Sequence, residues 1–238
     1  MTNKFGFLAR FELLQDLASI VISGIKPAIV HNIEKYHALK KVHYLTAIED
    51  IEGDYLEFGV FTGSSFCHSI RCNKKLSSLN ENIIRTRFFG FDSFEGFGEI
   101  NKEEQHPFYT DDNFNTSYEK VKKRVSKVSR EDRFKLVQGF FSESLKEGIS
   151  AFGIEKTKIL FIDSDTYSSA RDAFNFVLPT IQEGSYVILD DYYSYKGNRS
   201  LGVKKAFDEF VTKGNLEVRR VFTYGMGGAV YVVSAINK

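Results

Sequence analysis

Four aspartates follow two short apolar segments in the second half of the chain. They are Asp163 and Asp165, after Lys158–Ile162, and Asp190 and Asp191, after Tyr186–Leu189. If the two segments are neighbouring parallel strands, their carboxyl ends place all four carboxylates at one edge of a sheet. Carboxylates that close raise each other's pKa unless a cation or a ligand hydroxyl compensates the charge. Hard oxygen ligands suit Mg²⁺, Mn²⁺ or Ca²⁺. Any one aspartate alone is more simply explained as a helix cap, but the four together favour a cation site.

A turn with two glycines follows an earlier apolar segment, Tyr55–Val60. Gly59 and Gly63 would let the backbone approach a ligand closely, and Ser64 or Ser65 would begin a helix. Phe61 stands where the dinucleotide-binding fingerprint has its middle glycine, which disfavours a cofactor pyrophosphate at this turn. The alternative is a plain strand-to-helix turn.

Two further segment ends carry residues that suit a nucleoside. Asp92 directly follows the segment Phe88–Phe91, and a carboxylate there typically holds a ribose diol; otherwise it caps the following turn. Phe140 and Phe141 follow Phe134–Val137 and would form a wall for a flat base, unless they belong to the core.

Five apolar segments alternate with segments of helical character, at 64–74, 115–128, 142–147, 168–178 and 200–211. Such alternation predicts a doubly wound α/β fold with a mostly parallel sheet. Gly184 is expected to end a helix before the last of the five segments. The segments Glu217–Thr223 and Ala229–Val233, joined by a glycine-rich turn, predict an antiparallel C-terminal hairpin.

Residues 1–50 precede the first strand and form an expected N-terminal helical cap, followed by a single domain over residues 51–238. Leu13, Leu17, Ile20 and Val21 recur at helical spacing. Such helices would cover a sheet edge, form a lid or mediate contacts within a homo-oligomer.

Charge and composition narrow the class of partner and the location. The chain has 238 residues and a formal net charge of +1, which argues against a nucleic-acid partner. We found no apolar run long enough to span a membrane and no secretory signal. Two cysteines, Cys67 and Cys72, fall in one expected helix and predict no disulfide. We therefore expect a cytoplasmic protein.

Taken together, these motifs resemble a known family. The matching stretches are 57–65, 90–96, 138–144, 162–167 and 189–192. In this order they resemble the class I S-adenosylmethionine-dependent methyltransferases, and within them the macrocin O-methyltransferase (TylF/MycF-like) family, over about residues 40 to 213. The resemblance implies a Rossmann-like, seven-stranded sheet with the hairpin at its antiparallel end.

The resemblance also implies roles for single residues. The turn at Glu57, Gly59 and Gly63 would hold the methionine part of S-adenosylmethionine, Asp92 the ribose, and Phe141 with Ser142 the adenine. The full set implied to bind this cofactor is Glu57, Gly59, Phe61, Thr62, Gly63, Ser64, Ser65, Asp92, Ser93, Gly139, Phe140, Phe141, Ser142 and Asp163. The implied ligands of a divalent metal, most simply Mg²⁺, are Asp163, Asp190 and Asp191.

These expectations combine into one predicted activity, the methylation of a hydroxyl of a sugar or glycoside acceptor with metal assistance. The general base would be Asp191 or Asp165, and second to them His106. This histidine lies in a segment at 99–113, with Glu103, Glu104 and Asp111, that would form a lid or an acceptor-binding loop. A phenolic or other small hydroxylated acceptor, and a non-catalytic cofactor-binding protein, remain the alternatives.

Overall fold

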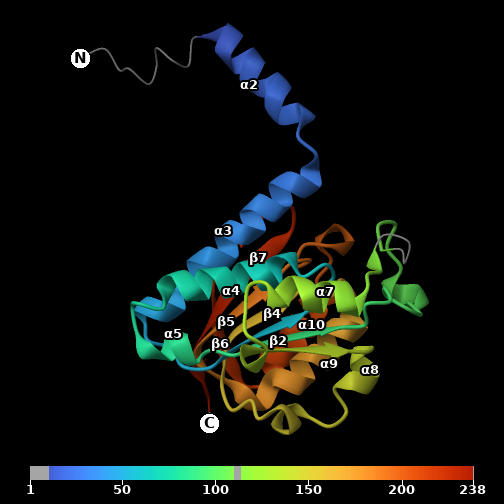
Figure 1. Ribbon diagram of the computed structural model, residues 1–238. Coiled ribbons are helices and arrows are strands. Elements are labelled where there is room, and N and C mark those ends of the chain that lie inside the picture. Colours follow the sequence, from blue (N-terminus) through green and yellow to red (C-terminus); the bar gives the residue numbers. More distant parts are fainter. Residues whose placement is uncertain (1–10, 110–113, 238) are drawn as a thin grey trace.

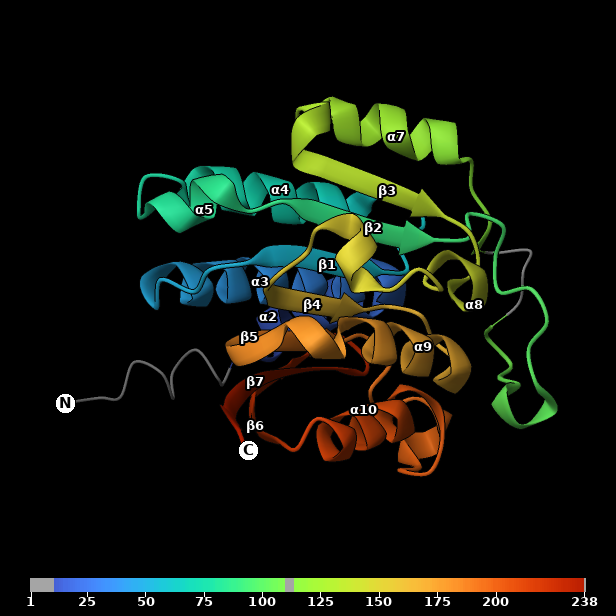
Figure 2. The ribbon, with the colours of Figure 1, turned by 90° about the horizontal axis from the view of Figure 1, so that it is seen from below.

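A seven-stranded sheet forms the centre of the molecule, in a computed structural model that describes residues 11–109 and 114–237. The strand order is β3-β2-β1-β4-β5-β7-β6 (Figures 1 and 2). The first five are parallel, whereas β7 runs antiparallel to β5 and β6 antiparallel to β7. The expected doubly wound α/β fold and its C-terminal hairpin are confirmed. The strands are β1 (Asp54–Phe58), β2 (Phe88–Asp92), β3 (Phe134–Gln138), β4 (Thr157–Ile162), β5 (Ile181–Leu189), β6 (Leu216–Tyr224) and β7 (Gly228–Ile236).

Burial explains why the central strands are continuous apolar segments. Every residue of β1 and β4 is buried, because helices cover both faces of the sheet. The expectation that Gly184 ends a helix is wrong, because β5 already begins at Ile181 and Gly184 lies within it with φ +87°.

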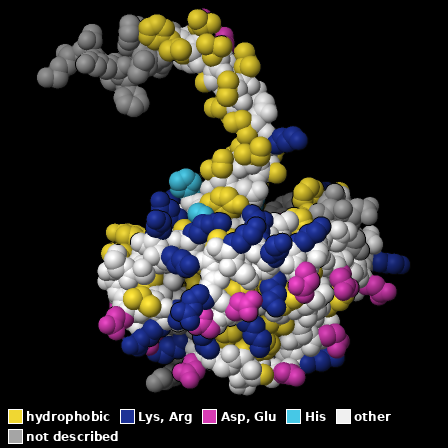
Figure 3. All heavy atoms as spheres, viewed as in Figure 1, with side chains coloured by type: hydrophobic (Ala, Val, Ile, Leu, Met, Phe, Trp, Pro, Cys, Tyr) yellow, Lys and Arg dark blue, Asp and Glu magenta, His cyan; other side chains and the backbone are white. Residues whose placement is uncertain are grey.

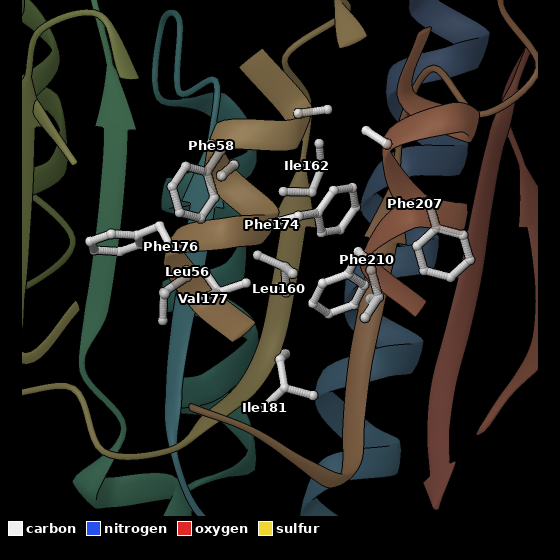
Figure 4. Packing of buried hydrophobic residues seen from close by; sticks show 14 of the residues in the cluster. Leu56, Phe58, Leu160, Ile162, Phe174, Phe176, Val177, Ile181, Phe207 and Phe210 are labelled. Atoms are coloured by element: carbon white, nitrogen blue, oxygen red, sulfur yellow. The ribbon is translucent and has the colours of Figure 1, made fainter. Parts of the chain in front are cut away.

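Helices form a layer on each face of the sheet (Figures 1 and 2). One face packs against α3, α4 and α7, and the other against α9 and α10. On the second face Phe174 stacks on Phe210 with ring centroids 4.6 Å apart, above Leu160 of the sheet (Figure 4). The α-helices are α2 (Glu12–Gly24), α3 (Pro27–Ile48), α4 (Ser64–Leu76), α5 (Glu81–Arg85), α7 (Tyr118–Ser126), α8 (Phe141–Ser144), α9 (Tyr167–Val177) and α10 (Gly202–Lys213). The short 3-10 helices are η1 (Lys102–Glu104), η2 (Glu131–Arg133), η3 (Ile149–Phe152), η4 (Leu178–Thr180) and η5 (Tyr195–Gly197).

The two N-terminal helices differ in their packing. The second half of α3 buries Ala38, Leu39 and Val42 against the sheet and α4. Helix α2 buries none of its residues against the described part of the chain, and it projects from the body with apolar side chains along its length (Figures 1 and 3). The helical spacing is therefore confirmed, but α2 covers no edge of its own sheet.

Within residues 11–109 and 114–237, the length and apolarity of the helices bear on whether the chain could cross a bilayer. No single helix is both long and apolar enough to cross a bilayer, while α2 and α3 taken together, bent by 92°, meet the criterion of length and composition.

The order in which the chain adds strands to the sheet reverses between β1 and β4. At this point the backbone requires a glycine. Beyond this point the chain winds outward to β2 and β3 on one side and to β5 on the other. Gly59, directly after β1, has φ +93°, and a Cβ there would lie 1.8 Å from the carbonyl oxygen of Asp163. Because only glycine fits, the ends of β1 and β4 approach each other more closely than side chains would allow.

Glu57, near the end of β1, lies beneath this turn with no exposed surface. Its carboxylate accepts hydrogen bonds from the hydroxyls of Tyr55 and Ser65. Burial, outweighing these hydrogen bonds, raises the pKa of Glu57 to about 7. Glu57 therefore links β1 to the start of α4 and so stabilises the turn between them.

We expect the free energy of unfolding of Glu57→Gln to rise relative to that of the wild type as pH rises. Between the ordinary pKa of 4.5 and the folded value of about 7, the folded wild type holds a proton that the unfolded chain has lost. The free energy of unfolding of the wild type therefore falls across this window, whereas glutamine stays neutral. Between pH 5 and pH 8 the difference should grow by about 2–3 kcal/mol, measured by urea unfolding.

Buried His43, whose pKa burial lowers to about 3, titrates in both proteins and cancels in this difference. The exposed Glu131→Gln is the control and should show no such trend. A difference between Glu57→Gln and the wild type that is the same at all pH values would contradict a buried, protonated Glu57.

Candidate active site

A cavity of about 620 Å³ opens at the carboxyl ends of the parallel strands, beside the point between β1 and β4 where the strand order reverses. This is where open α/β sheets bind ligands. Its walls come from the first half of α3, the turn after β1, the ends of β2, β4 and β5, a loop after β2, and the turn of the β6–β7 hairpin.

Many of the residues singled out in the sequence line this cavity. They are Gly59, Phe61, Asp92, Ser93, Phe140, Phe141, Asp163, Asp165, Asp190 and Asp191. Others do not contribute to its lining: Glu57, Thr62, Gly63, Ser64, Ser65, Gly139, Ser142 and His106. Two residues of the second group are bonded to each other beneath the turn after β1, because the Ser65 hydroxyl donates to Glu57.

Asp92 ties the end of β2 to the turn after β1. Its Oδ2 accepts hydrogen bonds from the backbone amides of Val60 and Phe61, both at 2.7 Å, and its Oδ1 accepts one from Phe94 at 2.6 Å. Burial raises the pKa of Asp92 against the opposing effect of these amides. Asp92 thus caps the local turns, which was the alternative weighed from the sequence, and it also lines the cavity.

Phenylalanines form an apolar wall of the cavity. Phe114 lies at its centre, with ring centroids 5.9 Å from Phe61, 5.1 Å from Phe97 and 5.7 Å from Phe108. Phe141 packs edge-on against buried Phe58, so its position is fixed by the core. Such a wall suits a flat base or the apolar face of a sugar ring.

The acidic cluster formed by the strand ends also lines this cavity. One carboxylate oxygen from each of Asp163, Asp190 and Asp191 lies within 4.8 Å of the others. Burial and the charge of Asp190 raise the pKa of Asp191 to about 6. Burial and the charge of Asp191 raise the pKa of Asp165 as well. The expected gathering of four carboxylates at one edge of the sheet is therefore present.

Two side chains of α3 compensate part of this charge. Lys35 Nζ lies 2.9 Å from Asp163 Oδ2 and 2.7 Å from Asp190 Oδ2, and His31 Nε2 lies 3.1 Å from the latter oxygen. Burial disfavours a charged carboxylate, but Lys35 and His31 outweigh it and lower the pKa of Asp190. Tyr224 of β6 donates to Asp190 Oδ1 at 2.7 Å.

The tautomer of His31 follows from its two contacts. The amide of Met226 donates to Nδ1 at 3.2 Å. This contact assigns the proton of a neutral ring to Nε2, facing Asp190. The turn of the hairpin therefore orients His31 toward the acidic cluster.

Two residues of the cavity wall have an unusual backbone conformation. Phe61 has φ +47° and Asp165 has φ +61°, although neither is glycine. Residues held in the left-handed region concentrate at binding and catalytic sites. At Asp165 the turn directs the chain from β4 into α9.

The loop after β2 is fixed to the rest of the site by a buried glutamate. Glu104 accepts hydrogen bonds from the amide and hydroxyl of Ser168 at the start of α9, at 2.6 and 2.9 Å. Its carbonyl oxygen accepts one from the Tyr195 hydroxyl at 2.7 Å. Glu104 thus docks the loop, while Asp111, another of its acids, lies outside the described residues.

His106 reaches the cluster only through a neighbour. Its ring stacks on Tyr109, with centroids 4.3 Å apart, and the Tyr109 hydroxyl lies 2.8 Å from Ser194 Oγ and 3.4 Å from Asp191 Oδ1. A direct proton transfer by His106 would need the loop to move.

Several residues of the site escaped the sequence reasoning. Lys35, His31 and Tyr224 lie far from the motifs along the chain, and no local pattern marks them. Ser164 stood within the Asp-x-Asp motif; the residue lines the cavity, and its buried hydroxyl has no hydrogen-bond partner among the residues described. A buried hydroxyl of this kind is suited to a ligand.

Comparisons with known proteins agree with this arrangement. The mycinamicin III 3''-O-methyltransferase of Micromonospora griseorubida is 24% identical over 179 residues, which cover 70% of this chain and 66% of that protein. The 8-demethyl-8-(2,3-dimethoxy-alpha-L-rhamnosyl)-tetracenomycin-C 4'-O-methyltransferase of Streptomyces olivaceus is 24% identical over 176 residues, covering 70% and 64%. The chain therefore spans just under two thirds of the length of each of these relatives.

Among solved structures, the O-methyltransferase NovP is similar in fold. The match has a TM-score of 0.68 at 20% identity and covers 84% of this chain and 79% of that one. The model of the macrocin-O-methyltransferase (TylF) family matches residues 30–219, which include every strand-end motif of the cavity. The family resemblance drawn from the sequence is confirmed, and the chain belongs to the macrocin-O-methyltransferase (TylF) family.

Proposed function

We propose that this protein transfers the methyl group of S-adenosylmethionine to a hydroxyl of a sugar or glycoside. One observation carries the proposal: the Gly59 turn and Asp92 face the same cavity as the carboxylates of Asp163, Asp165, Asp190 and Asp191. The proposed cofactor site and an acid-lined acceptor site would then lie side by side. The two relatives of the chain, named as O-methyltransferases, one of them for a rhamnosyl compound, support this reading.

The cofactor would occupy the β1–β2 side of the cavity. Its methionine part would lie along the backbone at Gly59, where no side chain intervenes, and its ribose hydroxyls would donate to Asp92. Phe140 and Phe141 would stack against the adenine. The sulfonium methyl group would then point toward the ends of β4 and β5.

The acceptor hydroxyl would attack this methyl carbon from the side opposite sulfur. A C–O bond forms as the C–S bond breaks, the electron pair stays on sulfur, and the hydroxyl proton passes to a carboxylate. Asp165 lines the cavity and is the base we propose, with Asp191 beside it as the second candidate. Holding the reacting atoms about 3–3.5 Å apart would account for much of the acceleration.

A divalent cation fits the acidic cluster, because three carboxylate oxygens from Asp163, Asp190 and Asp191 lie within 4.8 Å of one another and such oxygens are the ligands that hard cations prefer. When bound, Mg²⁺ would lower the pKa of a sugar hydroxyl and orient it together with its neighbour. Lys35 already bonds two of these three aspartates.

The first test combines a labelled-methyl assay with cofactor binding. With S-[methyl-³H]adenosylmethionine and a panel of nucleotide-activated sugars, glycosides and catechols, we expect label in a sugar. Asp165→Asn should lower kcat about 10²- to 10⁴-fold, because it removes the base, and leave the affinity for S-adenosylhomocysteine unchanged. Asp92→Asn should weaken that affinity about 10- to 100-fold.

The control is Asp132→Asn, an exposed aspartate paired with Arg130, which should match the wild type in both measurements. Label appearing in a catechol alone would replace the sugar with a phenolic acceptor. Tight binding of S-adenosylhomocysteine without transfer to any acceptor would favour a non-catalytic cofactor-binding protein.

Chelation tests the metal separately from the methyl transfer. Protein dialysed against EDTA should lose turnover and regain it as Mg²⁺ is added, because the acceptor hydroxyl is a poor nucleophile without it. Calorimetry with S-adenosylhomocysteine should give the same affinity before and after dialysis, since Asp92 and Gly59 are not among the proposed metal ligands. Full turnover in EDTA would remove the metal from the reaction and leave the methyl transfer in place.

We also propose that a second copy of this chain packs against α2. Leu13 is 72% exposed, Ile20 68% and Val21 65%, so the helix has no apolar partner within the described part of its own chain. Contiguous apolar surface of this kind marks an interaction site. Its charged residues, Glu12 and Asp16, are both acidic, which disfavours an anionic lipid surface and favours a protein partner. Because α3 shares the core of the following domain, α2 is the part of the N-terminal segment available for such contacts.

Light scattering during size-exclusion chromatography measures this association. The wild type should elute as a homo-oligomer and the double variant Leu17→Glu, Ile20→Glu as a monomer, because both side chains lie on one face of α2. Leu79→Glu, at an exposed leucine outside this helix, should keep the mass of the wild type. A monomeric wild type would overturn the proposal.

A further inference from the structure

A lysine occupies the side of the acidic cluster where a metal ion would bind. Lys35 Nζ lies within hydrogen-bond distance of Asp163 Oδ2 and Asp190 Oδ2, which follow the different strands β4 and β5. Its side chain is 11% exposed, and Nζ lies 5.7 Å from the centroid of the Phe161 ring in the sheet beneath. The ammonium group is therefore held among the carboxylates rather than at the surface.

A metal ion on these oxygens would compete with the ammonium group for them. Mg²⁺ binds its oxygen ligands at about 2.0–2.1 Å, so an ion that shares either Oδ2 with Lys35 would lie within about 5 Å of Nζ. Two cations so close repel each other strongly in a buried site. The second oxygen of Asp190 is also engaged, because it accepts the hydrogen bond of Tyr224, so a metal ion bound there would share it with that hydroxyl.

A lysine side chain can also move its charge away from the carboxylates when a metal ion binds. Its charge stands on a flexible four-carbon stem, and Lys35 lines the cavity, so the stem has space to withdraw. His31, one helical turn earlier on α3, would still bond Asp190 after the withdrawal.

We propose that Lys35 is a built-in competitor of the divalent cation, which balances the charge of Asp163 and Asp190 while no metal is bound and must leave them when a metal binds. This inference rests on the proposed metal site but not on the identity of the acceptor. Part of the binding free energy of the ion is then used to displace the ammonium group. The affinity of the wild type for a divalent cation is therefore lower than that of the same three carboxylates without Lys35.

Titration of metal-free protein with Mn²⁺, followed by calorimetry and by electron paramagnetic resonance of the free ion, tests the competition directly. Lys35→Met and Lys35→Gln should bind Mn²⁺ about 10- to 100-fold more tightly than the wild type, because no ammonium is displaced. Lys35→Arg keeps the charge and should not show this gain.

Two controls locate the effect. Lys40→Met removes an exposed lysine of the same helix and should bind Mn²⁺ as the wild type does. Adding Asp163→Asn to Lys35→Gln should abolish the gain. Circular dichroism and thermal unfolding of each variant verify folding, because Asp163 is itself an expected cofactor contact. Lys35→Gln serves where loss of the charge unfolds Lys35→Met, because its amide can still donate to a carboxylate.

Equal or weaker Mn²⁺ binding in Lys35→Gln would overturn the competition, and so would the absence of Mn²⁺ binding in both proteins. These outcomes are separate from the test of methyl transfer. An enzyme that needs no metal but gains Mn²⁺ affinity on loss of Lys35 keeps this inference and loses only the metal's part in the reaction.

Discussion

The repulsion among the carboxylates of Asp163, Asp190 and Asp191 is the constraint on which the rest of the site depends. Their oxygens converge within 4.8 Å, in a setting where water screens little of the charge. Unpaired buried charges at such distances are strongly destabilising, so the cluster persists because Lys35 and His31 meet it from α3. An N-terminal helix outside the strand-end motifs is therefore an integral part of the site.

The close approach of β1 and β4 decides where the two reactants would meet. Because Gly59 has no side chain, the turn after β1 lies directly against the backbone of Asp163. A ligand that lies along the backbone at Gly59 would therefore be next to the acidic cluster, with no side chain between them. The same contact explains why the motif needs a glycine here even though it lacks the middle glycine of dinucleotide-binding turns: the requirement comes from the neighbouring strand and not from a pyrophosphate.

Strand-end residues were the part of the site that the sequence could predict. Apolar segments of four to six residues mark buried strands, and topology then places the residues after each strand at one edge, which is how Asp92, Asp163 and Asp191 were found. Glu57 shows the limit of this logic, since the residue just inside the strand end points into the core and bonds Tyr55 and Ser65. Lys35 shows another limit, because a lysine on a helix looks like a surface residue until its three-dimensional neighbours are known.

The arrangement of α3 connects the two halves of the N-terminal segment. Its second half is anchored by Leu39 and Val42 in the core, its middle supplies Lys35 and His31 to the carboxylates, and its start adjoins α2, which has no apolar partner among the described residues of its own chain. The position of the Lys35 ammonium and the His31 ring is therefore set from one end by packing on the sheet. At the other end, the 92° bend between α2 and α3 lies only a few residues from the cavity wall.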